Sequence, residues 1–313
     1  MPELPEVEMT VRGLDEAISG ASIKDFWTDF HSARAGGKDD IKNPTHYALL
    51  RRKARGKKIL RVERRAKNVL IRLEGDLTVL VHMKMTGHFL VGRFAHDRKE
   101  NRWNAAEEGP MRDDPYNRHV RFLIELEDGR SVALSDMRRF AKVALVEGNP
   151  HQSAHLKDLG PEPLHDSFTF PVFKERLLRR GGKAIKTALM DQSSFVGVGN
   201  IYSDEALWRA GIHPEERAAN VSDEKMRALW KATREVLAAG VYIDDDATAE
   251  YRRPDGHKSN FSLPRRAYRQ TGKTCQRRGC AGKIARKIVS GRSAHFCDTC
   301  QPMPAKKKSG LGR

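Results

Sequence analysis

The sequence has few cysteines and no long apolar stretch. Its four cysteines, in 313 residues, all lie between positions 275 and 300. A secreted protein held together by disulfides normally spreads its cysteines along a small chain, so that class is not favoured. No apolar run approaches the ~20 residues that span a membrane. The start, MPELPEVEMT, lacks the basic and then apolar order of a signal peptide. These absences predict a cytoplasmic protein with no membrane partner.

Acidic residues are scarce relative to basic ones. The chain has 58 Lys and Arg against 41 Asp and Glu, a formal charge of +17. Residues 51–72 hold eleven basic residues and one acidic one, and residues 265–313 hold fourteen and one. Clustered positive charge suits a nucleic acid, because each neutralised phosphate releases counterions. Two solvated basic faces are the alternative interpretation.

Two kinds of hydrophobic periodicity divide the chain. Apolar residues at steps of three and four over residues 4–18 predict an amphipathic helix. Alternating apolar residues between 59 and 134, with turn signals at Glu74–Asp76 and at Asp128 and Gly129, predict an antiparallel sheet system. The charged segment 93–118 is predicted to be an inserted surface loop.

Glycine and proline near residues 147–163 end the strand pattern. Short helical segments follow between residues 173 and 237, and a long loop over 241–264 leads to the cysteines. With 39% apolar residues, the chain can build a core, which excludes a disordered chain. The predicted fold class is α+β with two domains: an antiparallel β-sandwich with an N-terminal helix, and a helical domain with a cysteine module.

The cysteine spacing predicts one metal site. Four residues separate Cys275 from Cys280, sixteen separate Cys280 from Cys297, and two separate Cys297 from Cys300. Two thiolate pairs joined by a hairpin-sized connector suit one structural Zn²⁺ ion in tetrahedral coordination, and disulfides are the alternative. The connector predicts two strands with a turn at Ser290 and Gly291, which places Arg292 near the tip of a metal-braced finger.

Proline at position 2 raises the prospect of chemistry at the chain terminus. Removal of the initiator methionine would leave a secondary amine with a pKa near ~8, so a usable fraction is neutral and nucleophilic. Attack on a sugar carbon would give a permanently charged iminium. Glu3 and Glu6 would supply carboxylates for proton transfer within a helical turn of that amine. The alternative is that Pro2 and the two glutamates only begin a helix.

Seven motifs identify a family. In order, the chain contains MPELPEVE at 1–8, RRAK at 64–67, MTG at 85–87, RRF at 138–140, LGPEP at 159–163, GVGNIY at 197–202, and the four-cysteine module. Together they closely resemble bacterial formamidopyrimidine-DNA glycosylases, the base-excision enzymes that remove 8-oxoguanine and ring-opened purines. The resemblance spans essentially the whole chain. The start PELPEVE, rather than PEGPE, resembles the purine-lesion branch and not the endonuclease VIII branch.

The resemblance implies a bifunctional DNA glycosylase and AP lyase, acting as a monomer on double-stranded DNA that contains oxidised bases or abasic sites. Pro2 matches the nucleophile that attacks C1′ and forms a Schiff base, and Glu3 matches its acid/base partner. Lys67 matches a lysine near the lesion, and Glu6 and His82 are candidate supporting residues. The family then eliminates the 3′ and 5′ phosphates in turn. Its fold implies a helix-two-turns-helix motif and a zinc finger in the second domain.

The resemblance also implies residues that touch DNA. Removing a damaged base from the stack leaves a hole that must be filled. Met85, Arg138 and Phe140 match an apolar plug, a guanidinium for the orphaned base and an aromatic wedge.

Three further residues match contacts to phosphates that flank the lesion. They are Asn200 at the start of a predicted helix, Arg292 in the finger, and Tyr268 seven residues before the first cysteine.

The chain departs from the family pattern at several points. Residues 82–87 are HMKMTG where HLGMSG is usual, and residues 136–141 are DMRRFA where DPRRFG is usual. The first cysteine knuckle is two residues longer, and segment 93–118 is expanded. None of these departures touches the nucleophile. They bear on orphan-base preference, loop geometry and lesion spectrum.

The complete prediction divides the chain into five segments. They are a catalytic β-sandwich domain over 1–146, a helix-two-turns-helix domain over 147–245, a lesion-capping loop and linker over 246–268, a zinc finger over 269–301, and a disordered basic tail over 302–313. Two other functions remain open: an endonuclease VIII-like glycosylase for oxidised pyrimidines, and a damaged-DNA-binding protein without catalysis.

Overall fold

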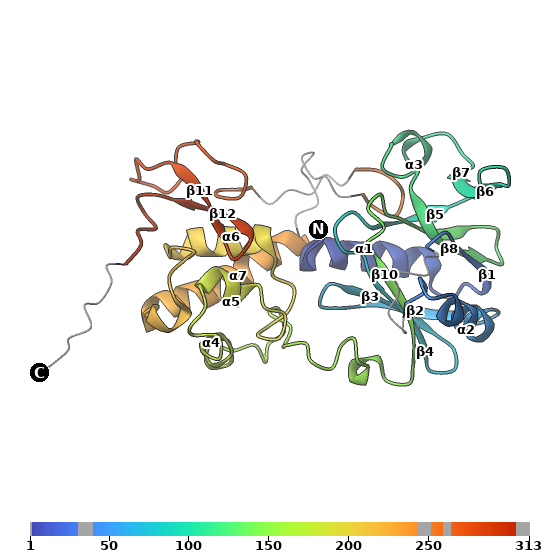
Figure 1. The fold of residues 1–313 in the computed structure, drawn as a ribbon, viewed down its shortest axis with the longest axis horizontal. Helices are drawn as coiled ribbons and strands as arrows, with labels where there is room; N and C mark the ends of the chain where they lie inside the picture. The colour runs from blue at the N-terminus through green and yellow to red at the C-terminus, as the bar shows by residue number, and fades with distance from the viewer. Residues whose placement is uncertain (1, 31–39, 243–251, 259–263, 305–313) are drawn as a thin grey trace, which may run out of the picture. The chain divides into compact units, whose positions relative to one another are not determined.

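The computed structural model of the protein describes residues 2–30, 40–242, 252–258 and 264–304, which fall into two units (Figure 1). The first contains the described residues up to Asp158 together with 252–258, and the second contains the rest. Antiparallel sheets form the first unit, and helices with a two-stranded finger form the second. The predicted α+β class with two domains is confirmed. Among the described residues, no helix is long and apolar enough to cross a membrane.

The first unit contains two four-stranded sheets, and every strand pairing within them is antiparallel. Alternate side chains from both sheets, such as Val79, Val81, Phe122 and Val143, form one buried cluster. The sheets run β1 (Ile23–Thr28), β8 (Val120–Leu126), β9 (Ser131–Ser135), β5 (His88–Gly92), and β10 (Lys142–Glu147), β4 (Leu77–His82), β3 (Asn68–Leu73), β2 (Ile59–Arg65).

The predicted N-terminal helix is α1 (Leu4–Ile18). Its apolar stripe of Val7, Val11, Leu14 and Ile18 belongs to the same buried cluster as the sheets. The core therefore fixes the axis of α1 relative to the strands. A second helix, α2 (Pro44–Ala54), and a 3₁₀ turn at Pro150–Gln152 complete the main elements of this unit.

The segment 93–118 is ordered, so its prediction as a plain surface loop is wrong. It forms the hairpin of β6 (Phe94–Asp97) and β7 (Arg102–Ala105) and a turn of helix, α3 (Pro110–Asp113). Phe94, Trp103 and Met111 pack on an apolar patch of the first sheet beside Trp27. Because the segment contains few apolar residues, its sequence did not predict that these three side chains pack on the sheet.

Asp114, which follows α3, forms an ion pair with Arg252, a residue far along the chain. Its carboxylate accepts bonds from the Arg252 guanidinium at 2.9 to 3.2 Å, and both side chains are almost completely buried. The Arg252 guanidinium also lies 4.3 Å from the centre of the Tyr116 ring. Residues 252–258 are thereby held on the first unit. The other residues of the predicted lesion-capping loop between 246 and 263 lie outside the described residues.

The second unit is built on helices α4 (Phe170–Leu178), α5 (Ile185–Leu189), α6 (Asn200–Ala210) and α7 (Asp223–Tyr242), with a 3₁₀ turn at Ala218–Asn220. Helices α6 and α7 lie side by side (Figure 1). Phe168, Phe173 and Phe195 form an aromatic core with ring centres 5.3 to 5.9 Å apart. Because α7 continues through Tyr242, the predicted loop over 241–264 begins too early.

The finger is the hairpin of β11 (Ile284–Val289) and β12 (Arg292–Cys297). Its turn residues Ser290 and Gly291 both have positive φ, at 48° and 76°. Such backbone matches the two-residue hairpin turn that the sequence predicts. Strand β12 packs against α6. The end of the predicted basic tail, residues 305–313, lies outside the described residues.

Candidate active site and metal centre

The N-terminal residues lie at the start of α1. The backbone N–H of Glu3 donates to the Glu6 carboxylate at 2.8 Å, within a reciprocal capping box. The Glu3 side chain is buried, whereas Pro2 is half-exposed. The structure therefore brings Pro2, Glu3 and Glu6 together at the end of a helix that the core holds in place.

Lys67 lies in the turn between β2 and β3, where Ala66 has a left-handed backbone with φ of 57°. Arg64 ties this turn to α1, because its Nε donates to Glu8 at 2.7 Å and its Nη1 donates to the Ala66 carbonyl at 3.0 Å. The Lys67 side chain is buried. Sequence reasoning missed the Glu8–Arg64 pair, because only the folded turn shows that the two elements meet.

His82 ends β4, and its ring is neutral at physiological pH. Burial, and then the positive charges of Lys84 and Lys67, lower its pKa to about 3. Its Nδ1 accepts the backbone N–H of Lys84 at 3.0 Å. A neutral ring that accepts at Nδ1 carries its hydrogen on Nε2. His82 is therefore an uncharged hydrogen-bond donor close to Lys67.

Met85, Arg138 and Phe140 lie on two neighbouring turns of the first unit. Met85 is 39% exposed and Phe140 is 47% exposed, so neither is a core residue. The Arg138 guanidinium lies 4.5 Å from the centre of the Phe140 ring. Two exposed apolar side chains beside a stacked guanidinium make a surface that can enter a base stack.

Asp136 organises both turns, and sequence reasoning did not single it out. Its buried carboxylate accepts the hydroxyl of Thr86 from one turn and the backbone N–H groups of Arg138 and Ala141 from the other, at 3.2 and 2.8 Å. Thr86 also accepts the Arg138 N–H at 3.2 Å. The carboxylate and hydroxyl thus couple the backbone that carries Met85 to the backbone that carries Arg138 and Phe140.

In the second unit, Asn200 begins α6 and contacts the finger. Its Nδ2 donates to the Ser293 hydroxyl at 3.2 Å. Ser293 follows Arg292, whose side chain is exposed at the start of β12. The structure therefore brings Asn200 and Arg292 to the same region of one unit. Gly197, with φ of 90°, makes the tight turn that leads into α6.

Tyr268 joins this region through its aromatic neighbour. Its ring meets the His295 ring of β12 edge to face, with centres 5.2 Å apart. The backbone N–H groups of Arg266, Ala267 and Tyr268 all donate to the buried carboxylate of Glu205 on α6, at 2.8 to 3.1 Å. Sequence reasoning missed Glu205, because its partners lie 61 to 63 positions away.

A buried polar cluster joins α5, α6 and the finger. Lys186 donates to the Asp204 carboxylate and to the Ser203 hydroxyl, the latter at 3.2 Å. Asp204 also accepts the His295 backbone N–H at 3.0 Å and lies 2.8 Å from His295 Nδ1. All four side chains are buried. The cluster fixes the finger relative to the helices that carry Asn200.

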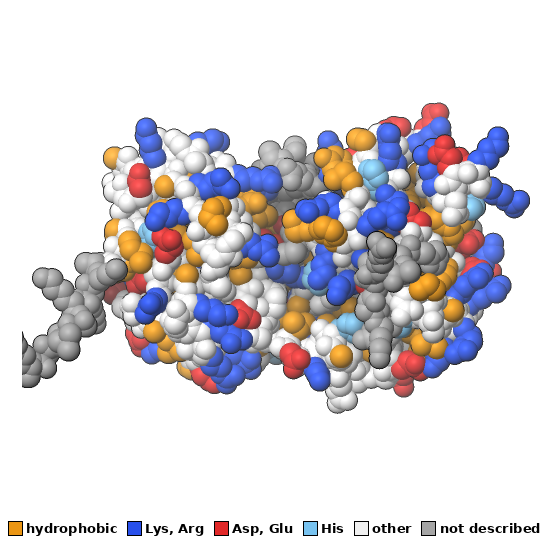
Figure 2. All heavy atoms as spheres, in the orientation of Figure 1, with side chains coloured by type: hydrophobic (Ala, Val, Ile, Leu, Met, Phe, Trp, Pro, Cys, Tyr) orange, Lys and Arg blue, Asp and Glu red, His pale blue; other side chains and the backbone are white. Residues whose placement is uncertain are grey.

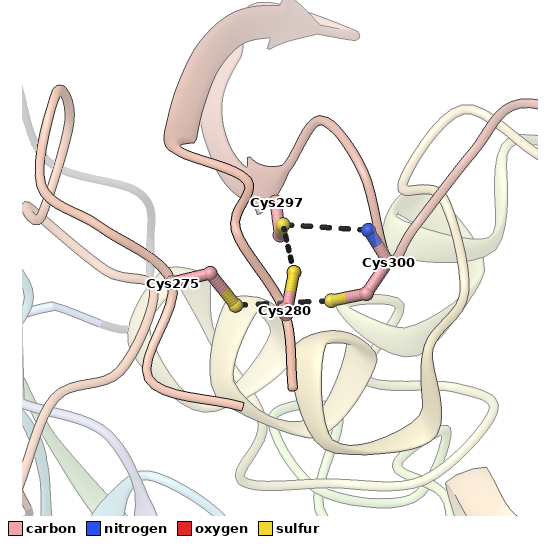
Figure 3. Close-up of side chains that lie close together, drawn as sticks. All are labelled: Cys275, Cys280, Cys297 and Cys300. Carbon is pink, nitrogen blue, oxygen red and sulfur yellow. Dashed lines mark hydrogen bonds between the residues drawn. The ribbon is translucent and has the colours of Figure 1, made fainter. Parts of the chain in front are cut away.

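The four cysteine sulfurs point toward one another (Figure 3). All four cysteines are free, and their sulfurs lie within 4.8 Å of each other. The Sγ of Cys275 lies 3.8 Å from that of Cys300, and the Sγ of Cys280 lies 3.6 Å from that of Cys297. Four sulfurs around a metal at about 2.3 Å would be spaced by about 3.8 Å. The geometry fits one tetrahedral metal site.

Neighbouring N–H groups suit thiolates at this site. Trp208 Nε1 donates to the Cys275 sulfur at 3.3 Å, and the backbone N–H of Cys300 donates to the Cys297 sulfur at 3.4 Å. Burial disfavours the Cys275 thiolate, but the N–H groups of Arg277 and Trp208 outweigh it and lower the pKa of Cys275 to about 7. Burial raises the pKa of Cys297 and of Cys300, so in the absence of a metal the cluster holds its negative charge at Cys275 first. The deprotonated sulfur is the form that binds metal.

Basic side chains are numerous on each unit, as the face in Figure 2 shows. Within the second unit, the guanidinium groups of Arg265 and Arg269 lie 5.4 and 5.6 Å from the centre of the Tyr268 ring. Phosphate-binding chemistry therefore surrounds an aromatic side chain at the finger.

Comparisons with known proteins agree over both units. The family model described as formamidopyrimidine-DNA glycosylase N-terminal domain matches residues 1–143, and the one described as formamidopyrimidine-DNA glycosylase H2TH domain matches residues 159–251. The Herpetosiphon aurantiacus formamidopyrimidine-DNA glycosylase is 35% identical over 301 residues, which cover 96% of this chain and 100% of that protein. The Thermus thermophilus protein of the same name is 36% identical, with 96% and 98% covered.

Solved structures show the same likeness. The crystal structure of the Thermus thermophilus MutM (Fpg) protein superposes with a TM-score of 0.76 at 34% identity, covering 97% of this chain and 100% of that one. Lactococcus lactis Fpg in complex with DNA containing an abasic site gives a TM-score of 0.78 at 26% identity, covering 96% and 99%.

The two-unit fold, the H2TH match and the four-cysteine cluster define a DNA glycosylase of base excision repair. Within that class, the chain belongs to the formamidopyrimidine-DNA glycosylase family.

Proposed function

We propose that the protein excises oxidised purines, 8-oxoguanine and formamidopyrimidines, from double-stranded DNA and then cleaves the strand. It would act as a monomer in the bacterial cytoplasm. The observation that carries the proposal is the start of α1, where half-exposed Pro2 precedes the buried Glu3 carboxylate. Relatives solved with damaged DNA support the substrate class, among them a Lactococcus lactis Fpg variant in complex with DNA containing Fapy-dG.

The reaction begins at the nitrogen of Pro2 once Met1 is removed. The neutral amine attacks C1′ of the damaged nucleotide, the bond from C1′ to the base breaks, and the leaving base takes up a proton from water. The nitrogen then loses its proton to Glu3, the bond from C1′ to the ring oxygen breaks, and Glu3 passes that proton to the oxygen, which leaves a Schiff base between Pro2 and C1′. Because the nitrogen is secondary, the iminium keeps its positive charge.

The iminium then drives strand cleavage. It acidifies the C2′ hydrogen, whose removal expels the 3′ phosphate, and a second elimination expels the 5′ phosphate. Water releases the remaining sugar fragment and regenerates the amine. The product is a gap of one nucleoside with a phosphate at each side. In this scheme, buried Lys67 and uncharged His82 hold the phosphate beside the lesion.

The proposed DNA contacts follow from exposure and position. Exposed Met85, Arg138 and Phe140 would fill the hole left by the flipped nucleotide, at a cost in unstacking of a few kcal/mol. In the second unit, Asn200, Arg292 and Tyr268 would bind phosphates that flank the lesion.

The four cysteines would hold one structural Zn²⁺, because thiolates at tetrahedral spacing are its preferred ligands in such sites. When bound, the ion supplies folding free energy and neutralises thiolate charge. The residues Cys275, Cys280, Cys297 and Cys300 brace the hairpin that carries Arg292, so the role of the metal is positional.

Borohydride trapping tests the proposed chemistry. A duplex with 8-oxoguanine opposite cytosine should give a covalent adduct with the protein, and Pro2→Gly should reduce it strongly. A matched control is one polypeptide with a cleavable N-terminal extension, which should trap DNA only after a protease exposes Pro2. Strand cleavage that persists with the amine blocked would refute the mechanism. Preference for a thymine glycol duplex would instead identify an endonuclease VIII-like enzyme.

A further inference from the structure

A pocket of about 290 Å³ lies on the outer face of the β10–β4–β3 sheet, beside the proposed reaction centre, with which it shares His82. In the sheet register, His82 faces Lys142 and Leu80 faces Ala144, so these four residues line one floor. Lys84 follows the end of β4. The lining residues are Asp40, Asn68, Leu80, His82, Lys84, Lys142, Ala144 and His155.

The pocket holds more positive charge than its own residues neutralise. Lys84 and Lys142 both line it, and neither forms an ion pair with any residue in the described ranges. Burial, followed by the charges of Lys142 and Lys42, lowers the pKa of Lys84. Asp40 is the one carboxylate among the described lining residues. It attracts Lys84 and Lys142 and also accepts the Lys42 backbone N–H at 3.0 Å, so one negative charge faces two ammonium groups. Crowded ammonium groups in a concave site attract an anion.

The backbone at Lys84 adds a second observation. Lys84 has φ of 58°, a left-handed conformation that favours glycine and disfavours any residue with a Cβ atom. Backbone strain of this kind concentrates at functional sites. The same conformation turns the Lys84 N–H onto His82 Nδ1, at 3.0 Å, and thereby keeps the hydrogen of His82 on Nε2. One strained residue thus supplies a charge and sets the donor of its neighbour.

We propose that Lys84 and Lys142 form an additional phosphate subsite, next to the site assigned to Lys67 and His82, which binds one backbone phosphate of the DNA strand. Two ammonium groups match the negatively charged oxygens of a phosphodiester, for which lysine acts as a point charge. The pocket adjoins the proposed reaction centre, because its lining residue Asn68 follows Lys67 directly. The proposal rests on the proposed function. Free inorganic phosphate has the same chemistry and is therefore the alternative ligand for this pocket.

The test uses the full-length protein and measures the affinity for an 8-oxoguanine duplex over a range of salt concentrations. Each phosphate contact contributes about 0.9 to the slope of log K against log salt. Lys84→Gly and Lys142→Met should each lower that slope by about 0.9, whereas Lys84→Arg should retain it. Lys84→Gly relieves the backbone strain, so its Tm should equal or exceed that of the wild type. This excludes misfolding as the cause of a lower slope.

Lys57→Met is the matched control. Lys57 is half-exposed, and it precedes the start of β2, whereas the pocket lies at the opposite end of the sheet, by His82 and Asn68. It removes the same charge, and we expect the slope to stay unchanged. A slope in Lys84→Gly and Lys142→Met that equals the Lys57→Met value would overturn the subsite.

Competition with inorganic phosphate distinguishes a DNA phosphate from a free phosphate as the ligand of the pocket. If Lys84 serves DNA, phosphate should inhibit binding only weakly, and equally in wild type and Lys84→Gly at matched ionic strength. Wild-type-specific phosphate binding with an unchanged DNA slope would assign the pocket to a free anion and overturn the proposal. Borohydride trapping by the wild type keeps the tests separate: an adduct without the slope change refutes only the subsite, and no adduct refutes the proposed function.

Discussion

Replacing Lys186 by methionine should destabilise the second unit strongly, because it leaves a buried carboxylate without its cation. Lys186 and Asp204 are 1% and 0% exposed, so water cannot replace the lost ammonium. Removing one partner of a buried ion pair costs about 3–5 kcal/mol. His295 still donates to Asp204 through its backbone N–H, which favours the lower part of that range.

Urea unfolding followed by tryptophan fluorescence measures this loss, because Trp208 and Trp230 lie in the second unit and Trp27 and Trp103 report on the first unit as an internal reference. With a slope of about 2 kcal/mol per molar urea, the midpoint should fall by about 1.5–2.5 M. The double variant Lys186→Met/Asp204→Asn should recover part of the loss, because the uncompensated charge is gone.

Lys174→Met is the control for this experiment. Lys174 pairs with Asp223 at 2.7 Å, but Asp223 is 71% exposed, so the cost should stay below about 1 kcal/mol. Equal losses in Lys174→Met and Lys186→Met would show that burial of the Lys186–Asp204 pair does not set its cost, and a double variant no more stable than Lys186→Met would show that the unpaired charge is not the cause.

Two further predictions concern the metal centre and the ion pair between Asp114 and Arg252. Cys297→Ser should release the metal from purified protein, as measured by elemental analysis, and weaken binding to lesion duplex; full metal content would argue against four sulfur ligands. Partial burial raises the pKa of Asp114, but the Tyr116 N–H and the Arg252 guanidinium outweigh it and lower the pKa overall. The ion pair therefore stabilises the fold at neutral pH, and this stability is lost as the pH falls through the lowered pKa of Asp114. The stability difference between wild type and Asp114→Asn should shrink below about pH 4, and a difference that is constant down to pH 2 would contradict this assignment.

Local sequence patterns predicted much of the fold. The stripe from Val7 to Ile18 and the alternation in β8 are strong because one face of each element lies in the core. Helix α2 gave no such signal, because only Leu50 and Ala54 are buried in it. The hairpin β6–β7 was missed for the same reason: a few aromatic side chains anchor a segment that is otherwise charged.

The candidate site likewise combines residues that the sequence predicts with residues that only the fold brings together. Cysteine spacing and the start PELPEVE are short-range patterns, and the sequence displays them directly. Asp136 and Glu205 act through backbone groups and side chains that the fold brings to them, so no spacing in the sequence predicts their roles. The pocket lined by Lys84 and Lys142 could not be predicted either, since it depends on the register that sets Lys142 opposite His82.

The atom that holds the sugar in the trapped adduct identifies the nucleophile directly. After borohydride trapping on an 8-oxoguanine duplex, the protein is digested and the modified peptide is sequenced by mass spectrometry. We expect Met1 to be absent and the added mass to lie on the nitrogen of Pro2. An adduct on a lysine such as Lys67, or active protein that still carries Met1, would contradict the proposed mechanism.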